Sequence, residues 1–159
     1  MKFHVCSSCS GKCADWGLLV LRLGVGVVFF AHGAQKLFGW FGGGGLTGTA
    51  GFFGTLGLAP AAFWTWLVAL VETFGGLALI LGLFTSVAGA LLFINMAVAF
   101  FLVHLKNGFF AGKGGYEFVL TLGVAALALA LSGAGRFALD AKMCKSCKGK
   151  GNVDTRTSV

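Results

Sequence analysis

Four long apolar stretches constrain this chain more than any other feature of its sequence. A helix that crosses the hydrocarbon core of a bilayer needs about 20 predominantly apolar residues. Stretches near this length are Trp16–Trp40, Ala61–Leu83, Ser86–Leu105 and Tyr116–Ser132. Only 11% of the 159 residues are charged and the mean hydropathy is +0.90, whereas about a quarter of the residues in a soluble domain are charged. The sequence therefore predicts an all-α integral membrane protein, a four-helix bundle.

The apolar stretches divide the chain into three parts. Residues 1–15 and 141–159 are short cysteine-rich tails, and residues 16–140 form the predicted membrane domain. The connector between the first two spans, FGGGGLTGTAGFFGTLGLAP, is rich in glycine, and we expect it to contain a short helix at the membrane interface.

The basic residues indicate how the spans are oriented. Four spans place both termini on one side, and nine basic residues then lie on that side: Lys2, Lys12, Arg22, Arg136, Lys142, Lys145, Lys148, Lys150 and Arg156. The opposite side carries Lys36, Lys106 and Lys113. Lys and Arg are enriched on the cytoplasmic side of membrane proteins. We therefore expect both tails in the cytoplasm and, in a bacterium, the protein in the inner (plasma) membrane. The net charge of +7 is attributed to this bias and to anionic lipids, and no nucleic-acid partner is expected.

Several polar side chains fall within or at the edge of the predicted spans. They are Arg22, His32, Gln35, Lys36, Glu72, Asn95, His104 and Glu117. Ionisable groups at membrane depth are costly, so they usually face the bundle interior and have partners. One interpretation is a polar pocket that binds a quinone head group or relays protons. The other is structural: Glu72 pairs with Lys36 or Arg22, and the histidines bond backbone groups. Haem is not expected, because the two histidines lie at different levels.

The segments that close the first and third spans resemble each other. FFAHGAQKLFGWFGGG and FFLVHLKNGFFAGKGG both contain a His, a Lys, glycines and aromatic residues, and a span with a glutamate follows each of them. The pattern is consistent with a duplicated helical hairpin or with a chance match of Phe- and Gly-rich segments.

All five cysteines lie near the chain ends, in CSSCSGKC and CKSCKGKG. Two cysteines separated by two residues can direct both sulfurs at one ion, and two such pairs complete a tetrahedral metal site. Because four spans bring both tails to one face, we expect Cys6, Cys9, Cys144 and Cys147 to share a metal, with Cys13 as a spare ligand. The metal is zinc or a rubredoxin-type iron. Redox-active or metal-sensing CxxC dithiols, and unrelated exposed cysteines, are the alternatives. Both stretches resemble the zinc turns of DnaJ-type chaperones over eight residues.

The membrane part resembles a known family. The segments LRLGVGVVFFAHGAQKLFGWFGGGGLTGTAGFFGTLGL, ALVETFGGLALILGLFTSVAG and HLKNGFFAGKGGYEFVLTLGVAALALALSGAGRFALD are similar to the DoxX family of small four-helix bacterial membrane proteins, from about Leu18 to Asp140. The resemblance implies a membrane-embedded redox role, because one relative is a subunit of thiosulfate:quinone oxidoreductase and others are linked to thiol, sulfur or quinone stress. Arg22, His32, Lys36, Glu72, His104 and Glu117 match the characteristic polar positions of the family. The cysteine tails are not part of its pattern.

Two functions follow from these observations. The first is quinone- or thiol/sulfur-linked redox chemistry, in which the chain is a subunit of a membrane oxidoreductase and carries a cytoplasmic metal site. The second is a non-enzymatic membrane module, a small transporter or an assembly subunit, with a structural zinc cap. The expected partners are the lipid bilayer, a quinone or small thiol/sulfur ligand, and partner subunits or further copies of the chain.

Overall fold

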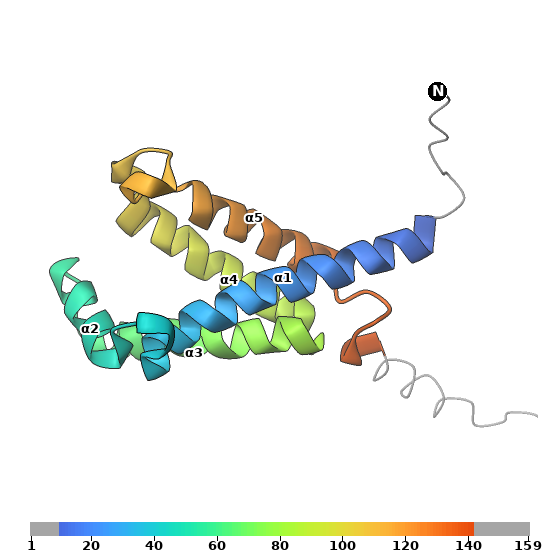
Figure 1. Ribbon diagram of the computed structural model, residues 1–159, viewed down its shortest axis with the longest axis horizontal. Helices are drawn as coiled ribbons and strands as arrows, with labels where there is room; N and C mark the ends of the chain where they lie inside the picture. Colours follow the sequence, from blue (N-terminus) through green and yellow to red (C-terminus); the bar gives the residue numbers. More distant parts are fainter. Residues whose placement is uncertain (1–9, 142–159) are drawn as a thin grey trace, which may run out of the picture.

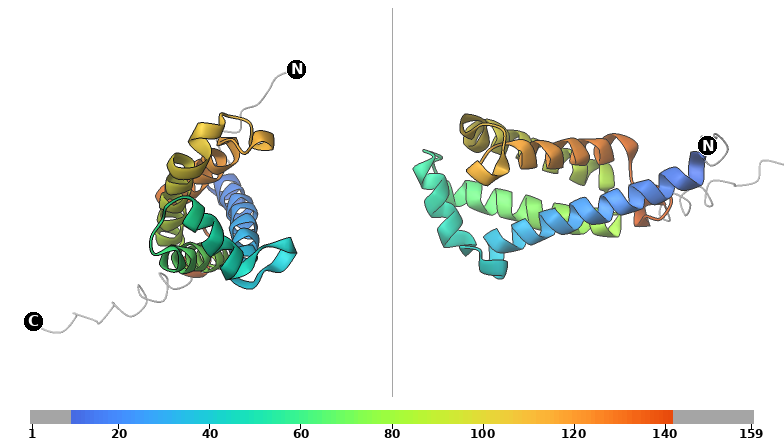
Figure 2. Two further views of the ribbon diagram at one scale, coloured as in Figure 1. Left: turned by 90° about the vertical axis from the view of Figure 1, so that its left-hand side faces the viewer. Right: turned by 45° about the horizontal axis from the view of Figure 1, so that its top comes forward.

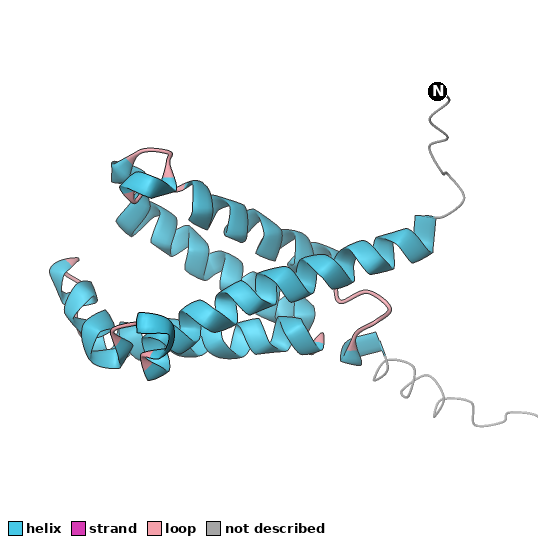
Figure 3. Ribbon diagram, in the orientation of Figure 1, coloured by secondary structure: helices cyan, strands magenta, loops and turns pink. Residues whose placement is uncertain are grey.

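The computed structural model describes residues 10–141, and all of its regular elements are helical (Figure 3). The α-helices are α1 (Ser10–Phe38), α2 (Gly45–Thr55), α3 (Ala61–Leu81), α4 (Thr85–Ala99) and α5 (Glu117–Ser132). Shorter turns are η1 (Trp40–Gly42), η2 (Phe100–His104), η3 (Leu105–Asn107) and η4 (Ala111–Lys113). Of these, η2 is a π-helix that continues α4, and the other three are 3₁₀ turns.

Three helices are long and apolar enough to cross a membrane. They comprise Cys13–Phe38 of α1, the whole of α3, and α4 with its continuation to Asn107. The fourth, α5, is apolar but has 16 residues, which corresponds to about 24 Å of helix. The predicted fold class, an all-α membrane helical bundle, is confirmed for the described residues. The connector also contains the expected short helix, α2.

Helix α1 is already helical at Ser10, the first residue described, so it extends beyond the predicted start of the first span at Trp16. The end of α3 follows directly from local sequence. Helix α3 ends at Leu81, and the next residue, Gly82, has a φ of 68°, in the left-handed region. The backbone N–H of Leu83 then donates to the carbonyl of Ala78 at 2.9 Å. This is the usual glycine termination of a helix, and it sets the tight turn into α4.

The long helices pack as two pairs, α1 with α3 and α4 with α5 (Figure 1). Glycines allow the backbones of the first pair to approach closely. A Cβ atom at Gly33 would overlap the backbone of Thr73, and one at Gly76 would overlap the backbone of Phe30. Small residues of this kind are the common contact between membrane helices, because lipid provides no hydrophobic force between them.

The two pairs separate toward one end of the molecule, where α2 lies (Figures 1 and 2). This is called the loop end, and it carries η1, α2, η3 and η4. The opposite end, called the terminal end, carries the beginning of α1 and residues 133–141 (Figure 1). The two similar segments of the sequence, FFAHGAQKLFGWFGGG and FFLVHLKNGFFAGKGG, occupy corresponding places in this arrangement. The first segment ends α1 and the second ends the extension of α4, and each of these helices is the first of its pair and ends at the loop end.

Candidate functional site

A cavity of about 530 Å³ lies at the loop end, and all five α-helices contribute to its wall. Its apolar lining consists of Phe29, Phe52, Phe53, Leu56, Leu58, Trp64, Val68, Met96, Val98, Ala99, Leu102, Val103, Phe118, Val119 and Leu122. Its polar lining consists of His32, Lys36, Glu72, Asn95 and His104. The volume is in the range of small-molecule sites, which are usually apolar with a few placed polar groups.

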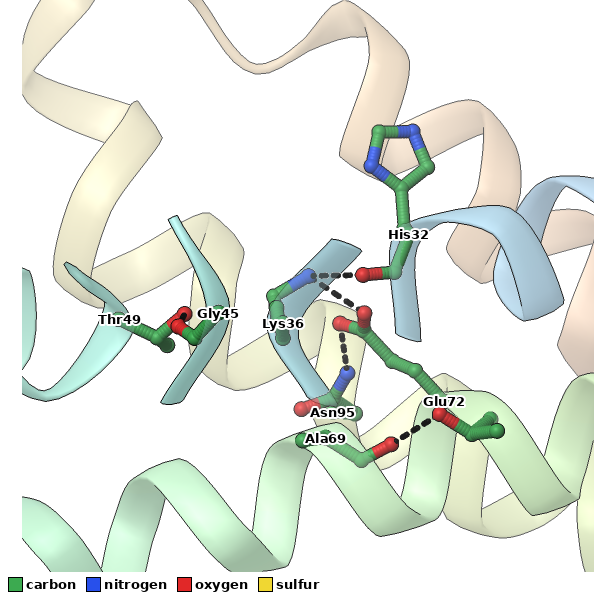
Figure 4. A network of polar contacts seen from close by, with 8 residues as sticks. His32, Lys36, Gly45, Thr49, Ala69, Glu72 and Asn95 are labelled. Carbon is green, nitrogen blue, oxygen red and sulfur yellow. Dashed lines mark hydrogen bonds and ion pairs between the residues drawn. The ribbon is translucent and has the colours of Figure 1, made fainter. Parts of the chain in front are cut away.

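Three of the polar side chains form a bonded group, here called the polar triad: Lys36, Glu72 and Asn95 (Figure 4). The ammonium of Lys36 donates to Glu72 Oε2 at 2.5 Å and to the carbonyl of His32 at 3.4 Å. The amide of Asn95 donates to Glu72 Oε1 at 2.9 Å. The triad therefore joins α1, α3 and α4 through one carboxylate.

The burial of Glu72 explains why it needs both partners. Its side chain is 4% exposed, while that of Lys36 is 26% exposed. A charge taken out of water is costly unless it is paired and its remaining lone pairs are hydrogen-bonded. With Lys36 charged and Glu72 ionised, the triad has no net charge. One N–H of Asn95, its carbonyl oxygen and the third N–H of Lys36 have no partner among the described residues, so the triad can still donate to and accept from a ligand.

The His32 side chain does not join the triad. Its ring points away from the Lys36–Glu72 pair (Figure 4) and packs against Phe118 of α5, with 5.7 Å between ring centroids. Within residues 10–141 the ring makes no hydrogen bond, although its backbone carbonyl accepts from Lys36. His32 thus contributes an unpartnered imidazole to the cavity wall.

The His104 side chain reaches the cavity from the π-helical segment η2. Its Nδ1 lies 2.7 Å from the carbonyl oxygen of Gly114, in the α4–α5 loop. Asn107 donates to the same carbonyl at 3.1 Å. His104 and Asn107, from the segments η2 and η3 that continue α4, therefore fix this loop. The side chain of His104 also lines the cavity.

The remaining predicted polar residues do not line the cavity. Gln35 donates to the carbonyl of Phe41 at 3.4 Å, and Glu117 accepts from the backbone N–H of Ala111 at 2.7 Å. Both hold the loops of the loop end in place. Arg22 lies at the other end of the bundle.

At the terminal end, residues 133–141 fold back across the helices, and this segment is called the strap. Arg22 is 2% exposed. It donates to the carbonyls of Ala134 at 2.8 Å and Phe137 at 3.1 Å. The Asp140 carboxylate accepts from the backbone N–H groups of Phe84 and Thr85, at 2.7 and 2.9 Å. These are unpaired donors at the beginning of α4, so Asp140 caps that helix.

The strap also contacts the beginning of α1. The backbone N–H of Arg136 donates to Asp15 at 3.0 Å, and the rings of Trp16 and Phe137 lie 4.7 Å apart. The chain segments next to the two tails are therefore held together at the terminal end.

The predicted metal ligands Cys6, Cys9, Cys144 and Cys147 lie outside the described residues. Cys13, on α1, is exposed and has no disulfide partner among the residues described. Between residues 10 and 141 there is no group of three or more His, Cys, Asp or Glu side chains arranged to hold a metal ion. The shared metal site stays a prediction.

Sequence reasoning missed two groups of residues. Phe52, Phe53 and Trp64 were not expected in the cavity wall, although the GFFG motif between glycines was a usable signal for an aromatic helix packed on the bundle. Asp140 was not expected to cap α4. Its only signal is an acidic residue after the last span, which many chains contain.

The fold and the cavity define the class: a small integral membrane protein, built from a helical bundle with a largely apolar cavity at its loop end. The chain belongs to the DoxX family, whose pattern matches residues 17–105. It is 35% identical to the Bacillus subtilis (strain 168) protein named "Putative oxidoreductase CatD" over 142 residues, which cover 89% of this chain and 97% of that protein.

A second relative is an uncharacterised protein of Haemophilus influenzae (strain ATCC 51907 / DSM 11121 / KW20 / Rd), 35% identical over 137 residues. The alignment covers 84% of this chain and 96% of the relative. No solved structure was found to match. Both alignments extend beyond residues 17–105, so the similarity includes most of the chain.

Proposed function

We propose that this protein is a membrane subunit of an oxidoreductase and that its cavity binds the head group of a quinone. The observation that carries this proposal is the composition of the cavity wall: a largely apolar and aromatic lining with one neutral polar triad and the side chains of His32 and His104. The description of the Bacillus relative as an oxidoreductase supports a redox role for the family.

The cavity wall favours a quinone over a thiol or sulfur anion. A small anion such as thiosulfate needs several donors or a net positive charge to offset its loss of hydration. Here the positive charge of Lys36 is already neutralised by Glu72. A quinone has a planar apolar ring and two carbonyl acceptors. Its ring suits Phe29, Phe52 and Trp64, and a carbonyl suits the remaining N–H groups of Lys36 and Asn95.

Fluorescence of Trp64 tests this proposal. Quinones quench indole fluorescence at short range, and Trp64 lines the cavity whereas Trp66, on the same helix, does not. We expect saturable quenching by decylubiquinone or menadione in detergent that W64F abolishes and W66F retains. Quenching that is linear in quinone and equal in both variants would contradict the proposal and favour the non-enzymatic membrane module.

We also propose that the two tails hold one metal ion through Cys6, Cys9, Cys144 and Cys147, with zinc more favoured than iron. The support comes from the described residues next to the tails. Asp15 bonds Arg136, and Trp16 packs on Phe137. A second support is sequence distance: Cys9 directly precedes the described region, and Cys144 is three residues after Ala141.

The proposed metal site and the cavity are two separate sites. Asp15 and Lys36 are 21 residues apart on one helix, α1, and a rise of about 1.5 Å per residue corresponds to roughly 30 Å. We therefore assign the metal a structural role that joins the tails, and we assign the exchange of electrons with quinone to a partner subunit that reaches the loop end.

Metal content measures the tail proposal directly. Purified protein should contain one zinc or iron per chain. C9S and C144S should each lose the metal, because the three thiolates that remain do not complete a four-thiolate site. C13S is the matched control and should keep the metal. Retention of metal in C144S together with loss in C9S and C13S would show a site within the first tail alone.

For location, we propose the bacterial inner membrane with both tails in the cytoplasm. The support is the excess of Lys and Arg toward the two ends of the sequence, compared with the three Lys residues of the predicted outer side. A reducing compartment also keeps thiols available for a metal. Cysteine labelling in intact cells tests the orientation: a membrane-impermeant reagent should modify an introduced K113C and leave Cys13 unmodified.

A further inference from the structure

The position of His104 in the cavity wall depends on an irregularity of helix α4. The backbone N–H of Leu105 donates to the carbonyl of Phe100, an i to i+5 hydrogen bond, and residues 100–104 are π-helical. A π segment accommodates one extra residue in a helix, and such segments are frequent at functional sites.

The same extra residue is visible in the sequence. In α1, His32 is two residues after the pair Phe29–Phe30, whereas in η2, which continues α4, His104 is three residues after the pair Phe100–Phe101. The π segment compensates for this difference, so that a histidine from each helix pair lines the one cavity. A regular α-helix would have turned His104 away from the position that corresponds to His32.

The hydrogen bond to Gly114 determines which nitrogen of the neutral His104 ring carries the proton. A carbonyl oxygen only accepts, so Nδ1, at 2.7 Å from it, is the nitrogen that carries the proton. In the neutral ring Nε2 is then a bare acceptor. In the triad both oxygens of Glu72 already have donors, and its acceptor that has no partner among the described residues is the carbonyl oxygen of Asn95.

From this geometry we infer that the cavity selects the reduced, hydroxyl-bearing form of its quinone, and that His104 Nε2 accepts a hydrogen bond from a ligand hydroxyl. The inference rests on the proposed function and adds the redox state of the preferred ligand. A quinol hydroxyl donates to Nε2. A quinone carbonyl has only lone pairs, and next to the Nε2 lone pair it is repelled.

The ratio of two affinities tests this inference. In wild type, H104L and N107A, anaerobic Trp64 quenching by decylubiquinone gives the quinone affinity, and recovery of the fluorescence on adding decylubiquinol gives the quinol affinity by competition. Wild type should bind the quinol about tenfold more tightly, the effect of one buried hydrogen bond. H104L should reduce the ratio to about one by weakening quinol binding.

Asn107 is the matched control, because it bonds the same Gly114 carbonyl but does not line the cavity. N107A should keep the quinol preference. If N107A loses it as H104L does, the effect comes from the loop and the inference is wrong. Equal affinities in wild type would also overturn it, while leaving quinone binding intact. Absence of saturable quenching by decylubiquinone would instead contradict the proposed function.

The tautomer of His104 provides a second readout that does not depend on ligand binding. In ¹⁵N-histidine-labelled protein at neutral or higher pH, the His104 signals are assigned by their loss in H104L. They should be those of the Nδ1–H form. Signals of the Nε2–H form would make His104 a donor to the cavity and would overturn the inference.

Discussion

The two ends of the bundle hold buried charge in different ways. At the terminal end, Arg22 donates to backbone carbonyls of the strap. At the loop end, Lys36 and Glu72 pair with each other beside a cavity. An arginine bonded to carbonyls of its own chain fixes a segment in place. A side-chain pair on a cavity wall keeps donors and acceptors that a ligand can reach, and this difference locates the candidate site at the loop end.

The largest expected effect comes from breaking the ion pair. K36M leaves the nearly buried Glu72 carboxylate without its cation and should lower the free energy of unfolding by about 3 kcal/mol, as measured by thermal or denaturant unfolding in detergent. The double variant K36M/E72L removes both charges and should recover most of this loss.

If the double variant is as unstable as K36M, the pair is not the source of the effect. Quinone quenching should be lost in both variants, because each removes a donor from the triad.

The next effect concerns the close contact between α1 and α3, which supports the triad. G33A places a methyl group against the backbone of Thr73 and should destabilise the protein by about 1–3 kcal/mol. G24A lies on the same helix with open space around the added atom. It should be neutral or stabilising by up to about 1 kcal/mol, since alanine favours a helix. Equal losses in the two variants would show that helix packing is not the cause.

The smallest effect is expected at the strap. D140A removes the cap of α4 and should cost about 1 kcal/mol. Hydrogen exchange should increase at residues 84–85 and in the strap, while Trp64 quenching stays unchanged. A change in quinone affinity would show that the two ends are coupled, contrary to the separation inferred from their distance along α1.

The sequence was sufficient to predict the all-α membrane bundle, because four apolar stretches of span length admit few other folds. It also singled out Lys36, Glu72 and Asn95 as membrane-embedded polar residues. It did not separate Arg22 from them, because an ionisable residue inside an apolar stretch has the same pattern whether its partner is a strap carbonyl or a side chain on another helix.

The cavity wall was harder to predict for a physical reason. Phe52 and Phe53 reach the cavity because α2 packs on the loop end, and long-range packing of a glycine-flanked helix leaves little periodic signal. The π segment is a change of one residue in the helical register, and His104 depends on it. The role of the cysteines remains a prediction, since the metal ligands lie outside residues 10–141.

Photoaffinity labelling with an azidoquinone tests the central claim most directly. Peptide mapping after illumination should find the label on residues that line the loop-end cavity, in the segments 52–68 and 95–104, and excess decylubiquinol should prevent it. K36M/E72L should lose this labelling. Label at the terminal end, on residues 15–22 or 133–141, or label spread over the lipid-facing helix surfaces and unaffected by competitor, would contradict the account.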